Sequence, residues 1–486
     1  ILTRSMKLDY MAKASAFINE PEGRIDRSDD QYMIEYRDFV MNSLYSGGKM
    51  NQFDQTTGLN YTLPINKIPL FNWVNATARY QSEYHWKASP LSLQDRFGNS
   101  IENSSSVQLN GNFRINNLYS KIPYLKKITT PSRASSRRPA SRNAETDEAA
   151  DKGKLSTSIL NETLKVLMMW KDASITYSEN KGNYMPGFIP EPDLLGNNWS
   201  KMAPGLGYVF GLENDIRYQA GLNGWLSTDS AQNQLSMNKH TTELNFRATL
   251  EPISDFRIEL SASRSTTNSS EDYYKWSDDD FEFQSFGAME RGSFSMSFLT
   301  IGTAFKKINK DNSSEPYNNM REYRIIIAER LAKENINWSG MYNDSTDFPL
   351  GYGSTSQDVI HGAFMAAYTG QSPETVKLKY FPRIPLPNWR FTYKGLSKIP
   401  LLKRWFKNIT ISHAYRSSYN IGSYISNIQF EEANGFASTL NDNFDFNSRY
   451  DVNLLSISEQ FSPLIRINTT LNNSMITNVE IKRSRN

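Results

Sequence analysis

Residues 74–86 alternate apolar and polar side chains with almost no interruption. The apolar set is Val74, Ala76, Ala78, Tyr80, Tyr84 and Trp86, and the polar set is Asn75, Thr77, Arg79, Gln81, Glu83 and His85. Because successive side chains of a strand point to opposite faces, this period of two predicts a strand with one apolar and one polar face. A chain built from such strands must find different surroundings for its two faces.

The same alternation recurs along the chain. It runs through 107–115 and through 244–262, where the segment 252–255 turns the chain and predicts an antiparallel hairpin. Further candidate strands are 32–42, 51–63, 165–178, 292–301, 407–419, 449–460, 463–473 and 475–483. Together these make roughly a dozen strands of the length, about ten residues, that crosses a bilayer when tilted.

Composition favours a sheet with one thin apolar face over a soluble domain with a large core. Only 38% of the residues are hydrophobic although 13% are aromatic, and 54 Lys and Arg nearly balance 51 Asp and Glu, which argues against a dominant nucleic-acid role. The absence of cysteine removes disulfides and thiolate chemistry. No run of about 18 apolar residues occurs, which excludes a transmembrane helix but leaves membrane-spanning strands possible.

Prolines mark a recurrent turn. Lys-Ile-Pro occurs at 67–69, 121–123 and 398–400, and Pro252 marks a further turn. Proline cannot donate to a ladder, so each belongs where a strand has ended. Counting strand directions places these prolines on one side of the sheet, which in a barrel would be the periplasmic side with most of the short turns. The predicted periplasmic turns are those at Pro69, Pro123, Pro252 and Pro400.

Long segments interrupt the strands. Residues 129–154 lack apolar periodicity and run from basic to acidic, which predicts a disordered loop. Residues 302–387 carry apolar positions at three- and four-residue spacing, which predicts short helices in a large loop insertion. We therefore expect an entry segment and first strand or strands in 1–50, strands with loops in 51–301, and strands again in 388–486. Since the chain starts without Met and ends within a strand pattern, we expect an internal fragment of a longer protein.

No catalytic or cofactor-binding pattern emerges from the residues. The four histidines lie far apart in sequence without the paired spacing of a metal site. The run Asp278, Asp279 and Asp280 lacks the spacing of a calcium-binding loop, and the glycine-rich stretches lack that of a phosphate-binding loop. We therefore expect no enzyme activity, no cofactor and no metal site.

A soluble β-sandwich would show the same alternation, with its apolar face packed on a second sheet. Two features favour a membrane barrel: the polar face carries charges, and aromatic side chains near strand ends suit an interfacial girdle. These aromatic residues are Trp73, Tyr84, Trp86, Trp389 and Trp405.

Several long blocks resemble one protein family. They are LPINKIPLFNWVNATARY, FGNSIENSSSVQLNGNF, LNFRATLEPISDFRIEL, FGAMERGSFSMSFLTIGTAF, SQDVIHGAFMAAYTG, FPRIPLPNWRFTYKGLSKI and LKRWFKNITISHAYRSSYNIGSY. These blocks look like the SprA/Sov family, the outer-membrane translocon of the type IX secretion system of Bacteroidota, which is linked to gliding motility in some members. The resemblance runs over most of the chain from about residue 50, and 129–154 matches no family pattern.

The resemblance implies a portion of a very large antiparallel transmembrane β-barrel in the outer membrane, with long extracellular loops that contain short helices. This chain would supply roughly a third of a barrel of about 36 strands. Family members export folded cargo proteins with C-terminal signals, and their partners are a PorV-type shuttle barrel and a periplasmic plug protein. The 302–387 insertion would then cap or line the extracellular vestibule, or hold a partner.

The family likeness also gives the two faces of 74–86 their expected surroundings. Val74, Ala76, Ala78 and Tyr80 would face lipid, and Asn75, Thr77, Arg79, Gln81 and Glu83 would line a water-filled lumen. Two alternatives stay open. One is a TonB-dependent or porin-type outer-membrane channel, and the other is a soluble β-rich adhesin or glycan-binding module that would place Trp73 and Trp86 on its ligand.

Overall fold

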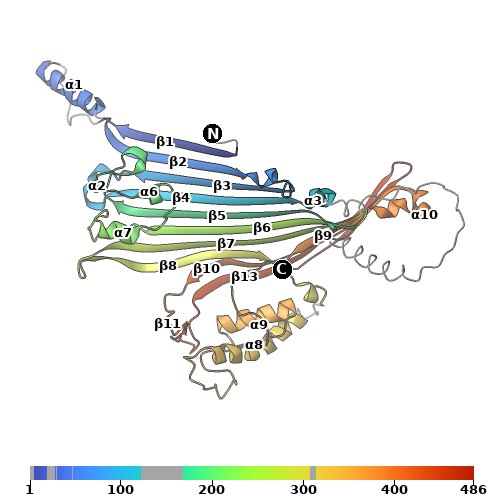
Figure 1. Cartoon of the computed structure of the whole chain (residues 1–486). Helices are drawn as coiled ribbons and strands as arrows, with labels where there is room; N and C mark the ends of the chain where they lie inside the picture. Colours follow the sequence, from blue (N-terminus) through green and yellow to red (C-terminus); the bar gives the residue numbers. More distant parts are fainter. Residues whose placement is uncertain are drawn as a thin grey trace, which may run out of the picture.

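One large antiparallel sheet dominates the computed structural model, which describes residues 5–18, 28, 30–45, 47–121, 168–306 and 314–485 (Figure 1). The sheet has 12 strands in the order β1-β2-β3-β4-β5-β6-β7-β8-β10-β13-β14, with β9 paired to β7 and β10. The strands are β1 (Met6–Phe17), β2 (Lys49–Leu63), β3 (Val74–Lys87), β4 (Asn99–Arg114), β5 (Trp170–Phe188), β6 (Ser236–Ile253), β7 (Phe256–Ser277), β8 (Glu282–Ser297), β9 (Asn388–Tyr393), β10 (Phe406–Ser426), β13 (Tyr450–Leu471) and β14 (Ile476–Arg485). The predicted antiparallel sheet is confirmed.

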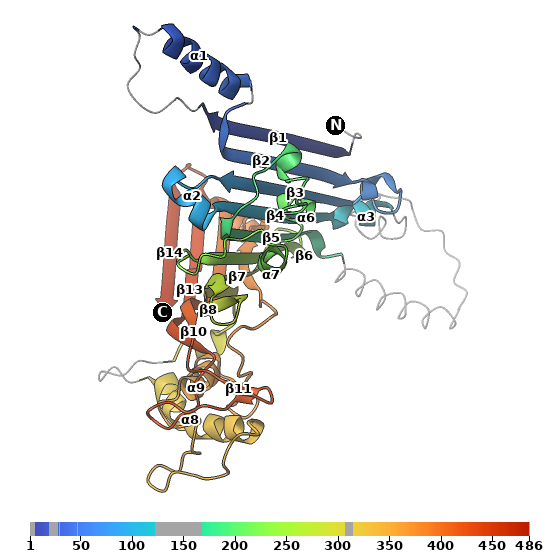
Figure 2. The same ribbon diagram turned by 90° about the vertical axis from the view of Figure 1, so that its left-hand side faces the viewer.

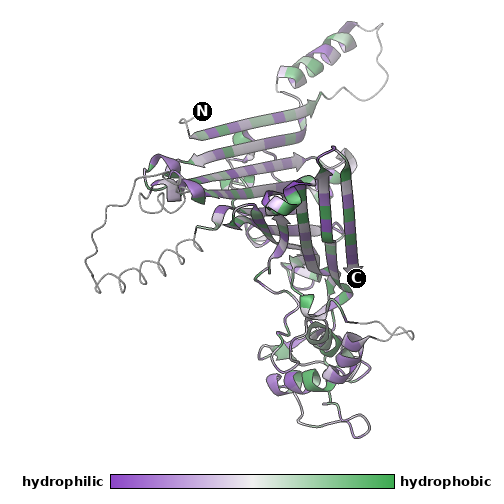
Figure 3. Ribbon diagram, turned by 90° about the vertical axis from the view of Figure 1, so that its right-hand side faces the viewer, coloured by the Kyte–Doolittle hydropathy of each residue, from purple (hydrophilic) through white to green (hydrophobic). Residues whose placement is uncertain are grey.

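The alternating sequences pair without slippage where their pattern is strictest. Strand β3 pairs with β2 from Gln52↔Lys87 to Leu63↔Ala76 and with β4 from Val74↔Phe113 to Lys87↔Ser100, with no register shift in either ladder. A slip by one residue would exchange the two faces, so a strict period of two specifies the register. Figure 3 shows the result as bands of opposite hydropathy that alternate along each strand.

Strands β8 and β9 occupy the same position in the strand order, between β7 and β10, and we call this shared position a lane. Strand β7 pairs with β8 through 264–277 and with β9 through 256–261, and β10 likewise pairs with both. Strands β8 and β9 are both antiparallel to β7 and β10, so they run in the same direction along the lane. The segment 298–387 therefore leaves the sheet in the middle of a strand lane and returns to the same lane.

The sheet curves strongly toward its C-terminal strands. Figure 2 shows β13 and β14 steeply inclined to β1–β5. Strands β1 and β14 are the two ends of the strand order, and within the described residues each has one strand neighbour. The described strands thus form a curved, open sheet.

The helices lie in the connections between strands. They are α1 (Asp30–Tyr45), α2 (Leu91–Phe97), α3 (Ile115–Lys121), α6 (Leu206–Val209), α7 (Arg217–Leu222), α8 (Glu315–Glu334), α9 (Gln357–Thr369) and α10 (Pro400–Lys403), with single 3-10 turns η1 (Pro64–Lys67), η2 (Leu194–Gly196), η3 (Ile301–Thr303) and η4 (Gly395–Lys398). A two-stranded ribbon, β11 (Glu432–Ala433) and β12 (Phe436–Ala437), lies in a loop. In the part of the chain that the structure describes, no helix is both long and apolar enough to cross a membrane.

Helices α8 and α9 confirm the prediction of helices in the long insertion. The N-cap Ser314 accepts a hydrogen bond from the backbone of Tyr317, and Gly370 ends α9 in the left-handed conformation that glycine adopts without strain. The division of the chain into the four expected segments stays a prediction.

Two strand predictions are wrong. The segment 32–42 belongs to helix α1, and its least exposed apolar residues, including Met33, Tyr36 and Val40, recur at helical spacing. The segments 449–460 and 463–473 are not two strands but one, β13. Pro463 lies where the ladder with β14 shifts register, between Phe461 and Ile465, which is a place where a strand tolerates proline.

The proline turns lie at one end of the sheet, which we call the Pro-turn end. Pro69 lies between β2 and β3, Pro252 near the end of β6, and Pro400 in the connection from β9 to β10. Lys398 pairs with Asp255, which joins two of these turns. Pro123 and the segment 129–154 fall outside the described residues. The chain leaves and re-enters the described part at Lys121 and Met168, beside the ends of β4 and β5 at the Pro-turn end.

Candidate functional surface

One face of the sheet is polar from β2 to β14, and we call it the polar face. Its rows follow from the strand register: Thr77 lies opposite Asn110, which lies opposite Thr176, and the row continues through Asn245 to Ser263. Farther along, Ser418 lies opposite Ser458. The sequence-predicted residues Asn75, Thr77, Arg79, Gln81 and Glu83 all lie on this face, each opposite Asn or Gln or Ser of β4. Serine, threonine and asparagine thus give the sheet a hydrated surface several strands wide.

The other face carries a continuous apolar belt toward the Pro-turn end. The rows here run from Ala76 through Gly111, Ile175 and Phe246 to Ala262. Val74, Ala76, Ala78 and Tyr80 lie in this belt, as do Leu59, Tyr61, Leu109, Tyr177, Leu244, Leu260, Ile411, Ile465, Ile467, Val479 and Ile481. The belt therefore crosses the sheet from one end of the strand order to the other.

Large side chains of the belt are exposed. Leu109 is 46% exposed, Ile175 41%, Ile465 47% and Ile481 55%. From Val74 to Tyr80 the belt extends about 20 Å along the strand. Leu70 and Phe71, which are exposed in the adjoining turn, lengthen it toward the about 25 Å of the apolar band of outer-membrane barrels.

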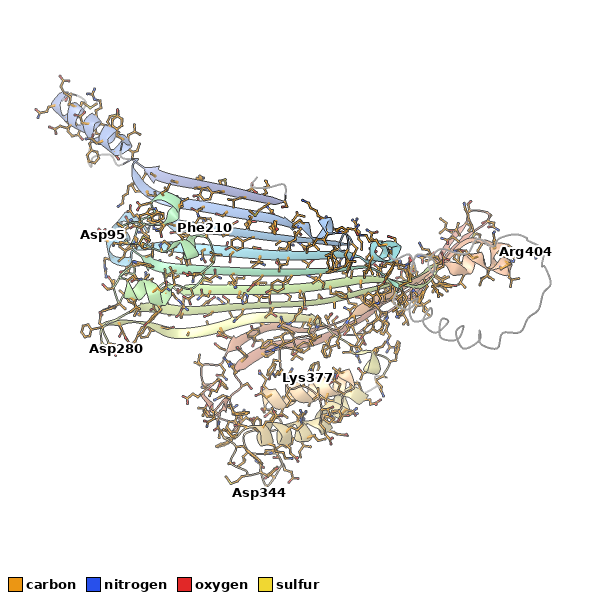
Figure 4. The ribbon with its side chains drawn as sticks, viewed as in Figure 1. Asp95, Phe210, Asp280, Asp344, Lys377 and Arg404 are labelled. Atoms are coloured by element: carbon orange, nitrogen blue, oxygen red, sulfur yellow. The ribbon has the colours of Figure 1, made fainter. Side chains whose placement is uncertain are left out.

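A first cover, residues 189–235, packs on the same face and begins at the edge of the belt, where the hydroxyl of Tyr80 donates to the carbonyl of Phe210. It buries Tyr84 and Trp86 completely, together with Ile101, in a core that also holds Tyr208 of the cover. The indole Nε1 of Trp86 donates to the carbonyl of Pro190 at 3.0 Å. Figure 4 places Phe210 of this cover and Asp280 at the end of the sheet opposite Arg404.

The first cover corrects the predicted aromatic girdle. Tyr84 and Trp86 cannot form an interfacial ring because both side chains are 0% exposed. Strand-end aromatic residues are equally suited to anchoring a loop, and here the loop between β5 and β6 folds back onto them. Trp405, by contrast, is 67% exposed at the Pro-turn end.

A second cover, formed by residues 298–306 and 314–387 of the insertion, packs on this face of β8 and β10. Its helices place Ile327, Ala363 and Met365 in one core with sheet residues that include Met296 and Tyr419. Those sheet residues lie on the face of the belt, since Met296 is opposite Tyr419 in the register and opposite Arg264, the partner of Leu244. The helices of the insertion therefore pack on the face of the belt, and the expectation that the insertion caps or lines the extracellular vestibule, or holds a partner, stays a prediction.

His361 of helix α9 lies inside the second cover. Its Nε2 is 3.1 Å from the hydroxyl of Tyr419, and its ring stacks on Tyr380 with 4.0 Å between centroids. Burial lowers the pKa of His361 to about 4, so the ring is neutral at neutral pH. The hydroxyl of Tyr380 donates to Asp358 at 2.7 Å, and burial raises the pKa of that carboxyl.

A buried carboxylate ties the second cover to the sheet. Glu459, 2% exposed, accepts hydrogen bonds from the hydroxyls of Thr300 at 2.7 Å and Tyr415 at 2.9 Å, and pairs with Arg485 at 3.1 Å. Arg485 also donates to the carbonyl of Thr303 at 2.8 Å. Sequence reasoning missed this network because its members come from four segments, the insertion, β10, β13 and β14, with no spacing that relates them.

The residues considered for metal binding are dispersed. His85 contacts Asp54 at 2.7 Å, His240 contacts Glu179 at 2.9 Å, and the remaining two histidines lie on other strands or helices. Asp280, in the turn between β7 and β8, accepts from Ser277 at 3.0 Å. Across the described ranges, no three His, Cys, Asp or Glu side chains gather as ligands for a metal ion.

Comparison with known proteins gives no family. No family model matches the chain, and no curated protein matches it. Among solved structures, the chain is similar to CdiB from Acinetobacter baumannii at 7% identity and a TM-score of 0.15, over 89% of this chain and 51% of that one. The chain thus spans about half the length of CdiB, and a TM-score of 0.15 is too low to assign a shared fold.

Proposed function

We propose that this sheet is part of the wall of an outer-membrane β-barrel, with the apolar belt in lipid and the polar face toward a water-filled lumen. The observation that carries the proposal is the bare belt. A soluble sheet would bury so continuous an apolar surface, whereas a membrane barrel presents it to lipid with polar residues inside. The first cover reaches the belt at Tyr80, but Leu109, Ile175, Ile465 and Ile481 stay exposed, which leaves a band free for the bilayer.

We further propose that the barrel conducts proteins, as in the type IX translocon that the sequence blocks resemble. A lumen for folded cargo needs a hydrated surface that does not hold its passenger. The Ser, Thr and Asn rows of the polar face supply one, and the aromatic residues Tyr84 and Trp86 are turned away from it into a core. The PorV-type shuttle barrel, the plug protein and cargo with C-terminal signals are the partners of this proposal.

The soluble adhesin alternative has less support, because one of its two candidate ligand-binding tryptophans is buried. Trp86 is fully buried, and the indole of Trp73 donates to the carbonyl of Leu70 at 2.9 Å within its own turn. A porin-type channel would share the two faces of the sheet but should close into a smaller barrel that passes small solutes.

Depletion of the full-length protein tests the translocon function. We expect signal-bearing cargo to accumulate in the periplasm while the uptake of small solutes is unchanged. Normal export with impaired solute uptake would favour the porin-type channel instead.

A further inference from the structure

Arginine side chains gather on the polar face near the Pro-turn end. An open hollow of about 670 Å³ lies over β6, β7, β9, β10 and β13. The first four of these strands each contribute one arginine to its lining, namely Arg247, Arg257, Arg390 and Arg416. We call this hollow the arginine trough. All four arginines alternate with belt residues and therefore share the polar face.

Most of this positive charge is not neutralised. Glu259 is the one carboxylate among the residues that line the trough, and Arg257 pairs with it at 3.0 Å. Arg247, Arg390 and Arg416 are exposed and form no ion pair within the ranges that the structure describes. The lining therefore has a formal charge of +3 from four arginines and one glutamate.

The excess of positive charge belongs to the trough. Toward the opposite end, the same face carries both signs of charge, namely Glu83, Glu102 and Glu243 together with Lys87 and Lys239. Since the whole chain has a net charge of only +3, the trough is a concentration of charge and not a reflection of composition. A hollow with several unpaired cations focuses the field and attracts anions.

We propose that the arginine trough binds an acidic polypeptide segment. Guanidinium groups match carboxylates bidentately, and the use of arginine alone, with no lysine, suits this recognition. Four neighbouring strands span about 14 Å, the length of an extended peptide of about five residues. Neutral side chains in the lining, among them Ser261 and Gln460, offer hydrogen-bond partners to a peptide backbone.

The role of the segment rests on the proposed function. If the Pro-turn end is periplasmic, the trough lies near the mouth by which exported proteins enter the lumen. An acidic stretch of the passenger would meet it first and be oriented there. Exposed ion pairs are weak and exchange rapidly, so the contact steers the passenger without retaining it.

The test uses full-length protein in detergent and a fluorescent hexaglutamate peptide, with binding followed by anisotropy at low salt. We expect R247Q/R390Q/R416Q to weaken binding about tenfold. The matched control R37Q/R79Q/R404Q removes the same charge outside the trough and should change binding less than twofold. Circular dichroism should be unchanged in both variants, because all six arginines are exposed.

Equal weakening by both triple variants would overturn the assignment, since it would mean attraction by net charge alone. Stronger competition by inorganic triphosphate than by unlabelled hexaglutamate would also overturn it, in favour of a phosphate site. Both readouts use purified protein, so a negative peptide-binding result would not contradict the proposed export function. Conversely, loss of the export function would leave a measured peptide affinity intact.

Discussion

The hydroxyl of Thr300 donates to the carboxylate of Glu459 at 2.7 Å and so joins the start of the insertion to strand β13. We expect Glu459→Gln to weaken the docking of the insertion by about 2 kcal/mol, because the change removes the charge that partners Arg485. Hydrogen exchange of the amides in 298–306 measures the effect. The control Glu432→Gln, in an exposed pair with Arg449, should change exchange little, and an equal effect in both variants would contradict the prediction.

Trp86 anchors the first cover. Trp86→Ala should destabilise the packing of 189–235 by about 3–5 kcal/mol, because it leaves a large cavity and an unpaired carbonyl at Pro190. Limited proteolysis within 189–235 reports this loosening. Trp405→Ala removes an indole that is 67% exposed and should leave the cleavage rate unchanged. Unchanged cleavage in the Trp86 variant would show that the cover is held elsewhere.

Acid should loosen the second cover through His361. Its pKa is about 4 when folded and about 6.5 when unfolded, so the unfolded state binds more protons between these values and stability falls as pH falls. At pH 5 the loss should reach about 2 kcal/mol. Asp358 has a raised pKa, so its protonation increases stability as pH falls, opposite to the effect of His361. Asp358 remains present in the comparison variant His361→Gln.

Hydrogen exchange in α9 at pH 7 and pH 5 measures this dependence. The wild type should exchange faster at pH 5, after correction for the intrinsic rate, and His361→Gln should lose most of the change. The same dependence in both proteins would assign it to other groups.

Adjacent residues on β3 should respond oppositely to a charge. Ala78→Arg places a cation in the belt and should cost about 2–4 kcal/mol of stability in the membrane, with loss of assembled protein from the outer membrane. Thr77→Arg, one residue away on the polar face, should be tolerated. Quantifying each variant in the outer-membrane fraction checks the pair, and equal yields would show that belt and polar face share one environment.

The period of two predicted the strands, their two faces and the hairpin at Pro252, because each is a local property of alternation and turn residues. It could not show that Tyr84 and Trp86 lie under a cover, because the sequence pattern of an apolar strand end is the same whether that end faces lipid or a protein core. The helix α1 was mistaken for a strand since its short apolar pattern fits both periods.

Long-range features escaped the sequence for a different reason. The lane shared by β8 and β9 and the contacts of Glu459 depend on which distant segments become neighbours. The arginine trough likewise assembles single arginines from four strands that have no common motif. Such clusters become visible only when the register of the whole sheet is known.

Labelling the two ends of the sheet in cells tests the membrane-wall account most directly. The chain has no cysteine, so the full-length protein, rendered free of cysteine elsewhere, can carry Asn72→Cys at the Pro-turn end or Asp344→Cys in the insertion, both exposed positions. Intact cells are treated with a maleimide too large to cross the outer membrane. We expect labelling of the Asp344 variant alone, and of both after lysis. Equal labelling of both variants in intact cells would mean that no membrane separates the two ends, which would contradict the account.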